Sequence, residues 1–188
     1  MRVVALAALL ASVAVVLPAS GTTHRSLTFN EIVNRSGVIF RAEVTAQRAE
    51  WRERAGSRAI VTIVDFRLER ALKGLVESVR RVEFLGGTIG DQQLVVHGMP
   101  QFTVGDRDIV FLRDVPDVFP VVGGTQGRFK ILRGADAVDR VMFADSTPVP
   151  SVNQVGRARI LVSPTTLSAL RVDDFESAIL EEVRRARR

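Results

Sequence analysis

The sequence has no cysteine and no tyrosine, one tryptophan and only two histidines. Without cysteine there can be no thiol nucleophile, zinc–thiolate site, iron–sulfur cluster or disulfide. Disulfides commonly stabilise small exported domains. Because this chain can form none, its stability must come from an apolar core. The histidines, His24 and His97, have no second metal ligand at a recognisable spacing. The chain also lacks Gly-x-Ser-x-Gly and Ser-x-x-Lys motifs, which argues against a serine hydrolase.

Lysine is scarce, and arginine supplies almost all of the positive charge. The 26 basic and 21 acidic residues give a net charge of +5, and both signs alternate along the whole chain. This distribution is typical of a solvated surface, so no nucleic-acid partner is expected. The arginines of residues 184–188 would offset the negative end of a helix dipole. Attachment to a membrane surface or nucleic acid is the alternative role for this segment.

The N-terminal segment has the pattern of a secretory signal peptide over residues 1–21. An apolar run over residues 3–17 lies between Arg2 and Pro18. It is shorter than the roughly 20 residues that a spanning helix needs. We therefore expect cleavage near Gly21 and an extracytoplasmic protein, periplasmic or secreted, with no membrane span after cleavage.

Residues 22–145 have the pattern of a β domain preceded by a short helix. Thr28 and Glu31 predict a capping box at the start of that helix. Apolar residues then recur at every second position, most clearly over residues 58–71, whereas residues 107–113 are apolar on both faces and predict a buried strand. The expected strands are 38–44, 58–71, 78–85, 92–97, 107–113, 119–122, 128–132 and 140–143.

The segments between these strands are polar or glycine-rich. Residues 47–57 are interpreted as a charged connection around Trp51. Residues 123–127 are interpreted as a tight turn, because they lack the Lys-Ser/Thr of a phosphate loop and precede a strand. The acidic pair of Asp106 and Asp108 flanks a turn and is interpreted as solvated rather than as a catalytic dyad.

Residues 146–188 are expected to form a loop and a C-terminal helical segment packed on the β domain. Ser163 and Pro164 predict the start of a short helical turn. Asp173 is expected to cap the last helix, with Glu176 completing a second capping box. The apolar stripe of that helix consists of Phe175, Ile179 and Val183.

Residues 30–132 resemble the netrin-type, tissue-inhibitor-of-metalloproteinases-like OB domain. The similarity rests on the helix-to-strand entry at 31–42, on the long strand ending at 66–74, and on Val-Gly-Asp at 104–106 before the buried strand. Gly-Met-Pro-x-Phe at 98–102 and Gln-Gly-x-Phe at 126–129 are similar to stretches of exported bacterial proteins of uncharacterised function.

The resemblance implies an OB-like barrel, closed or partly open, of five to seven short strands with an N-terminal and a C-terminal helix. The inhibitors of that family place the amine and carbonyl of an N-terminal cysteine on the protease zinc. This chain has no cysteine, so their mechanism transfers to no residue here, and the scaffold alone does not imply a function.

Our first functional hypothesis is an exported, non-enzymatic binding module that uses no cofactor. Its partner would be an exported protein, contacted by Trp51, Arg52, Arg54 and Gln126. A cell-envelope hydrolase using carboxylates is the alternative, and it requires a pocket with two acids about 5 to 10 Å apart. A polyanion-binding OB domain is another, and it requires a basic groove lined by aromatic residues.

Overall fold

The computed structural model describes residues 25–54, 56–74, 77–114, 119–157 and 169–188. In this part the chain is mainly β, as predicted, with two α-helices. The predicted signal peptide, His24 and the predicted turn after Ser163 lie outside the described residues. No helix in the described ranges combines the length and apolar composition that crossing a bilayer requires.

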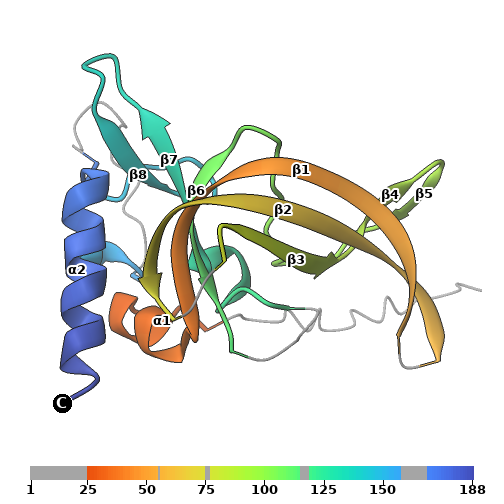
Figure 1. Cartoon of the computed structure of the whole chain (residues 1–188), viewed down its shortest axis with the longest axis horizontal. Helices are drawn as coiled ribbons and strands as arrows, with labels where there is room; N and C mark the ends of the chain where they lie inside the picture. The colour runs from red at the N-terminus through yellow and green to blue at the C-terminus, as the bar shows by residue number, and fades with distance from the viewer. Residues whose placement is uncertain (1–24, 55, 75–76, 115–118, 158–168) are drawn as a thin grey trace, which may run out of the picture.

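A six-stranded antiparallel sheet has the order β3-β2-β1-β6-β7-β8 (Figure 1). A separate hairpin pairs β4 with β5. Between the edge strands β3 and β8 the described residues form no pairing, so no closed barrel is found there. The strand bounds are β1 Val38–Arg54, β2 Ser57–Lys73, β3 Val79–Leu85, β4 Gly87–Ile89, β5 Gln92–Leu94, β6 Arg107–Leu112, β7 Arg128–Arg133 and β8 Asp139–Phe143.

The strands β1 and β2 form a long hairpin that arches over β3 (Figure 1). Residues 47–54, which the sequence analysis interpreted as a connection, belong to β1, and Trp51 pairs with Ile60 in the ladder. That interpretation is wrong because the polar residues of this stretch obscure the period-two signal, while pairing to the clearly alternating β2 determines its conformation. Residues 119–122 form only one bridge, Leu112 with Val121.

Two apolar clusters cover opposite faces of the sheet. On the helix-covered face, α1 (Phe29–Arg35) and α2 (Val172–Arg185) pack on β6, β7 and β8. The other face, here called the inner face, carries the cluster of Phe40, Phe66, Phe84 and Phe102. Because side chains alternate along a strand, β6 contributes Ile109 and Phe111 to the first cluster and Val110 and Leu112 to the second.

The two helices begin differently. The α1 capping box is confirmed, since Glu31 N donates to Thr28 Oγ1 and Thr28 N donates to Glu31 Oε2. The predicted box of α2 is wrong. The N-cap is Arg171 and makes no side-chain cap, and Glu176 turns away from the helix start because it is buried against arginines of the sheet.

Candidate functional site

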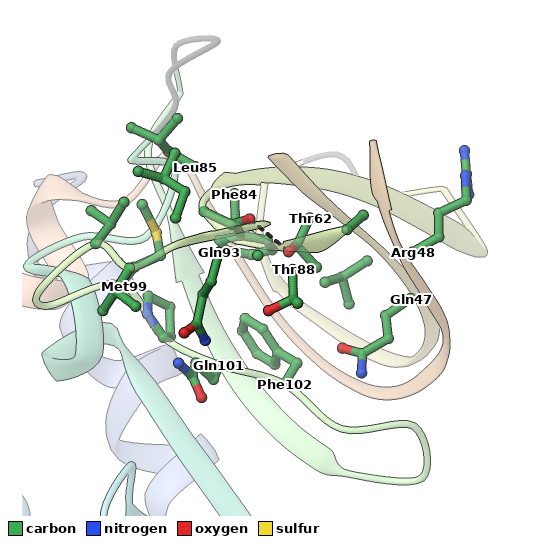
Figure 2. A pocket seen from close by; sticks show the side chains of 18 residues that line it. Gln47, Arg48, Thr62, Phe84, Leu85, Thr88, Gln93, Met99, Gln101 and Phe102 are labelled. Carbon is green, nitrogen blue, oxygen red and sulfur yellow. Dashed lines mark hydrogen bonds between the residues drawn. The ribbon is translucent and has the colours of Figure 1, made fainter. Parts of the chain in front are cut away.

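A cleft with a volume of about 430 Å³ lies on the inner face between the β1–β2 hairpin, the β4–β5 hairpin and residues 95–102 (Figure 2). We call it the inner cleft. Two glycines turn the chain out of β3 to form its wall, Gly86 with φ +107° and Gly87 with φ +139°. A Cβ on Gly87 would lie 2.5 Å from Thr62 Oγ1, so only glycine allows this approach.

Backbone contacts fix the β4–β5 hairpin against β2. Gly86 N donates to Ile60 O at 2.8 Å, and Thr62 Oγ1 donates to Gly86 O at 2.7 Å. Both contacts join Gly86, between β3 and β4, to residues 60–62 of β2. The wall of the inner cleft is therefore hydrogen-bonded to the rigid sheet.

Aromatic rings form the base of the inner cleft. The Phe102 ring centroid lies 5.1 Å from that of Phe66 and 5.0 Å from that of Phe84. Below it, Arg128 Cζ lies 4.3 Å from the Phe102 ring centroid. The rings pack as core residues, since Phe84 is 2% and Phe102 is 6% exposed, and they leave little aromatic surface open to a ligand.

Polar side chains surround this base. Gln47 comes from β1, Thr88 from β4, Gln93 from β5 and Gln101 from the segment before β6, and Figure 2 shows them on different sides of the Phe102 ring. Within the described ranges none of the four side chains has a hydrogen-bond partner. Each carboxamide carries a donor and an acceptor, so the inner cleft presents several neutral groups that a ligand could satisfy.

Formal charge is nearly absent from the inner cleft. Of its described lining residues, Arg48 is the one charged side chain, and its Nε lies 2.7 Å from Glu50 Oε1. The lining includes no carboxylate and no histidine. It therefore offers recognition by hydrogen bonding and shape rather than groups for acid–base chemistry.

A buried ion cluster lies beneath Phe102. Arg128 Nε lies 3.0 Å from Asp108 Oδ1, and Arg128 Nη2 lies 2.6 Å from Asp106 Oδ2. Arg128 Nη1 also donates to the Gln101 carbonyl. The interpretation of both acids as solvated is wrong for Asp108, which is fully buried, because alternation along β6 places it on the inner face.

Burial has an electrostatic consequence for Asp108. Loss of water around the carboxylate raises its pKa to about 6, and the charge of Arg128 offsets this only in part. Arg128 divides its guanidinium among two carboxylates and a backbone carbonyl. The cluster thereby ties residues 101–106 to β6 and β7 and fixes the base of the inner cleft.

Three of the predicted contact residues lie at the end of the β1–β2 hairpin. Trp51 is on the same strand face as Gln47 and Ala49, next to the inner cleft, and Arg58 Cζ lies 4.7 Å from its ring centroid. Arg52 points to the opposite face, where its Nη2 lies 2.8 Å from Glu50 Oε2. Arg54 is the last residue of β1 and pairs with Ser57.

The fourth predicted contact residue, Gln126, has a structural role. It lies in the 3-10 helix η1 (Gly124–Gly127). Its Oε1 accepts from Leu27 N at 2.7 Å, and its Nε2 donates to Arg25 O at 3.3 Å. These bonds hold the chain just before α1, and Gln126 is not among the residues that line the inner cleft.

The inner-cleft carboxamides were missed by the sequence analysis, although two signals lay near them. The Gly-Met-Pro-x-Phe stretch at 98–102 supplies the base, and the Gln-Gly-x-Phe stretch at 126–129 supplies Arg128. The two stretches also meet where Thr125 N donates to Gly98 O at 3.0 Å. The two stretches thus lie together beneath the inner cleft.

The described residues contain no group of three or more histidine or carboxylate side chains that could hold a metal ion. Asp106 and Asp108, the acidic pair noted in the sequence, are not among the residues that line the inner cleft. Comparison of the chain with protein-family models, curated proteins and solved structures finds no match. The function must therefore be inferred from the geometry of the inner cleft.

Proposed function

We propose that this chain is an exported, non-enzymatic binding module whose ligand occupies the inner cleft. One observation carries the proposal. Three carboxamides and a hydroxyl without hydrogen-bond partners in the described residues surround an apolar base. Gln47, Thr88 and Gln93 lie on hydrogen-bonded strands, and the backbone of Gln101 accepts from Arg128. Preformed concavities in which a few polar groups converge are typical of ligand sites, and the inner cleft has both features.

The scaffold in this proposal is a partly open OB-like barrel. Its support is the strongly curved β1, which pairs with β2 on one edge and with β6 on the other. Export through the leader at residues 1–21 belongs to the same proposal. The partner is accordingly a molecule of the extracytoplasmic space.

The burial and ion pairing of the acidic side chains near the inner cleft favour a binding function over the carboxylate-hydrolase alternative. The acidic pair Asp106 and Asp108 lies beneath the base of the inner cleft, and Arg128 contacts both. A catalytic pair must reach a substrate, whereas Asp108 is buried. Binding of a polyanion is less well supported, because the one cation in the lining, Arg48, is already paired with Glu50.

The test is a crosslinking pulldown from the native cell envelope with matched variants of the mature chain. Combined Gln47→Ala, Gln93→Ala and Gln101→Ala substitution is expected to lower the yield of specifically crosslinked partner at least about ten-fold, since each lost hydrogen bond contributes about 1 kcal/mol. Gln92→Ala is the control, because Gln92 neighbours Gln93 on β5 but does not line the inner cleft.

Thermal unfolding of each variant verifies that the fold is retained before the yields are compared. The proposal is wrong if the triple variant, folded like the wild type, recovers the same partners in the same amounts. It is also wrong if Gln92→Ala lowers the yield as much as the triple substitution does.

A further inference from the structure

We infer that the inner cleft binds an extended polypeptide segment of an exported partner, which lies beside β1 as an added strand. This inference rests on the proposed function and specifies the chemical class of its ligand. It is carried by three observations: the unpaired edge of β1, the way that edge opens into the inner cleft, and the neutral side chains on both sides.

The second edge of β1 is paired over only part of its length. β6 pairs with β1 from Val38 to Glu43. The last backbone bonds on that edge join Val44 N to Asp106 O at 2.8 Å and Gly105 N to Val44 O at 2.9 Å. From residue 45 to residue 54 the edge has no backbone partner in the part of the chain that the structure describes. Such an edge can pair with another chain.

This unpaired edge faces the inner cleft. Gln47, Arg48 and Ala49 all line it, although side chains of successive strand residues point to opposite faces. Three consecutive residues can line one cleft only where the strand presents its edge and backbone to it. A ligand in the inner cleft therefore lies within reach of the backbone N–H and C=O groups of β1.

The unpaired carboxamides suit a peptide backbone. A carboxamide carries the same donor and acceptor as a peptide group. Figure 2 shows Gln47 on one side of the Phe102 ring and Gln93 and Gln101 on the other. A strand between them would meet the β1 backbone along one edge and side-chain amides along both flanks.

The remaining lining favours a peptide over a neutral glycan. Recognition of a sugar ring commonly uses an open aromatic face, but Phe84 and Phe102 are only 2% and 6% exposed. The lining instead includes the partly exposed aliphatic side chains of Leu94, Val96 and Met99, which suit alternate apolar side chains of an extended segment. With no carboxylate in the lining and Arg48 already paired, the bound segment should be uncharged at its centre.

The length of the segment follows from strand geometry. A strand rises about 3.3 Å per residue, so the stretch from Gln47 to Trp51 measures about 15 Å and accommodates about five ligand residues. Peptides that add to a sheet edge gain affinity from main-chain hydrogen bonds and specificity from alternate side chains. The ligand should therefore tolerate substitution at every second position.

The experiment begins with selection of seven-residue peptides from a random displayed library on the full mature chain. A selected peptide is then resynthesised with single backbone N-methyl groups at each position. Pairing with β1 predicts that methylation at alternate residues weakens binding at least about ten-fold, whereas methylation at the residues between them changes it less than about two-fold. Gln47→Ala should also weaken binding several-fold, and Gln92→Ala should not.

Amide hydrogen exchange provides a second readout. Binding of the peptide should slow exchange at alternate residues from Gln47 to Trp51, because their N–H groups gain partners, and leave exchange in β7 unchanged. A library that yields no binder, or a peptide whose affinity is indifferent to the position of N-methylation, overturns the inference.

A panel of neutral oligosaccharides separates this inference from the proposed function. If an oligosaccharide binds and the triple carboxamide variant loses it, the inner cleft is a ligand site but the polypeptide inference is wrong. If no partner, peptide or sugar depends on the inner-cleft side chains, the proposed function itself fails.

Discussion

On the helix-covered face of the sheet, Arg41 and Glu176 contact oppositely charged groups, whereas on the inner face Gln47 and Gln93 have no hydrogen-bond partner within the described ranges. Both faces carry polar side chains next to an apolar cluster. They differ in whether the chain itself places a counter-charge or a hydrogen-bond partner beside those side chains, although Arg41 Nε and Glu176 Oε1 meet their counter-charges without hydrogen-bond geometry. Groups satisfied internally stabilise the fold, and groups left without partners are available to a ligand.

The ions on the helix-covered face form a continuous chain across the strands. Glu176 on α2 lies 3.0 Å from Arg41 on β1 and 2.5 Å from Arg70 on β2. Arg41 then contacts Glu69 at 2.9 Å, and Glu69 contacts Arg107 on β6 at 2.7 Å. This network links α2 to three neighbouring strands.

A β-bulge makes the network possible. Arg41 pairs with Arg70 in the β1–β2 ladder, and the next residue, Ala42, pairs with Leu68. Glu69 is therefore the extra residue of β2 and has no cross-strand residue opposite it on β1. An extra residue in one strand can bring two consecutive side chains to the same face, and here both Glu69 and Arg70 reach ions of the helix-covered face.

The largest expected effect comes from breaking this network. Glu176→Ala should lower the free energy of unfolding by about 3 kcal/mol, because it removes the buried carboxylate that contacts both Arg41 and Arg70 and leaves Arg41 with Glu69 alone. Chemical denaturation measures the loss. Because Glu176 lies on the face opposite the inner cleft, peptide affinity measured where the variant is folded should stay within about two-fold of the wild-type value.

The matched control is Glu181→Ala on the exposed face of the same helix. The Glu181 side chain is 68% exposed and, among the described residues, pairs with Arg185 alone at 3.5 Å, so its removal should change the free energy of unfolding by less than about 0.5 kcal/mol. Equal losses for the two variants would show that the network on the helix-covered face does not stabilise α2.

Asp108 gives the next largest effect and tests the inner face. Burial raises the pKa of Asp108 to about 6, whereas an unfolded aspartate has a pKa of about 3.9. The folded chain therefore binds the proton more tightly than the unfolded chain. Asp108 should thus add about 2 kcal/mol of stability as the pH falls from about 7 to about 4.5. The gain is measured as the difference between the wild-type and Asp108→Asn curves, because burial also raises the pKa of Glu176.

The control for this prediction is a second acid whose pKa moves the other way. Hydrogen bonds from Arg81 lower the pKa of Asp65, so Asp65 contributes stability above its unfolded pKa and loses it only as the pH falls through its lower folded pKa. Asp65→Asn should retain the gain between about pH 7 and about pH 4.5. Parallel pH curves for wild type and Asp108→Asn would contradict the prediction.

Much of the fold could be predicted because local patterns and tertiary packing agree. The Thr28 capping box, the long strand β2 and the doubly apolar β6 occur as expected, although the centre of β2 is buried on both faces rather than on alternate residues. The end of β1 could not be predicted, since its residues are mostly polar and show no clear period of two. They form a strand through pairing with β2. The curvature and the strand order of the sheet likewise depend on pairing between strands that are far apart in the sequence.

The site was less predictable than the fold for a physical reason. From the sequence alone, a glutamine is expected to be a surface residue. Whether the side chain of Gln93 or Gln101 has a hydrogen-bond partner depends on segments that meet only after folding. Glu176 shows the same limit, because its capping pattern gave no sign of the arginines that the strands bring to it. Only the Gly86–Gly87 pair signalled locally that the chain turns there.

The smallest expected effect concerns Trp51, at the outer end of the inner cleft. Arg58 lies over its ring and is itself exposed, so Arg58→Ala should lower the free energy of unfolding by only about 0.5 kcal/mol. Trp51 is the only tryptophan, so its fluorescence reports this contact directly and should change in the variant. Arg52→Ala, on the opposite strand face, should leave the spectrum unchanged. An unaltered spectrum in Arg58→Ala would mean that the contact does not persist in solution, and Trp51 would then be free to extend the inner cleft.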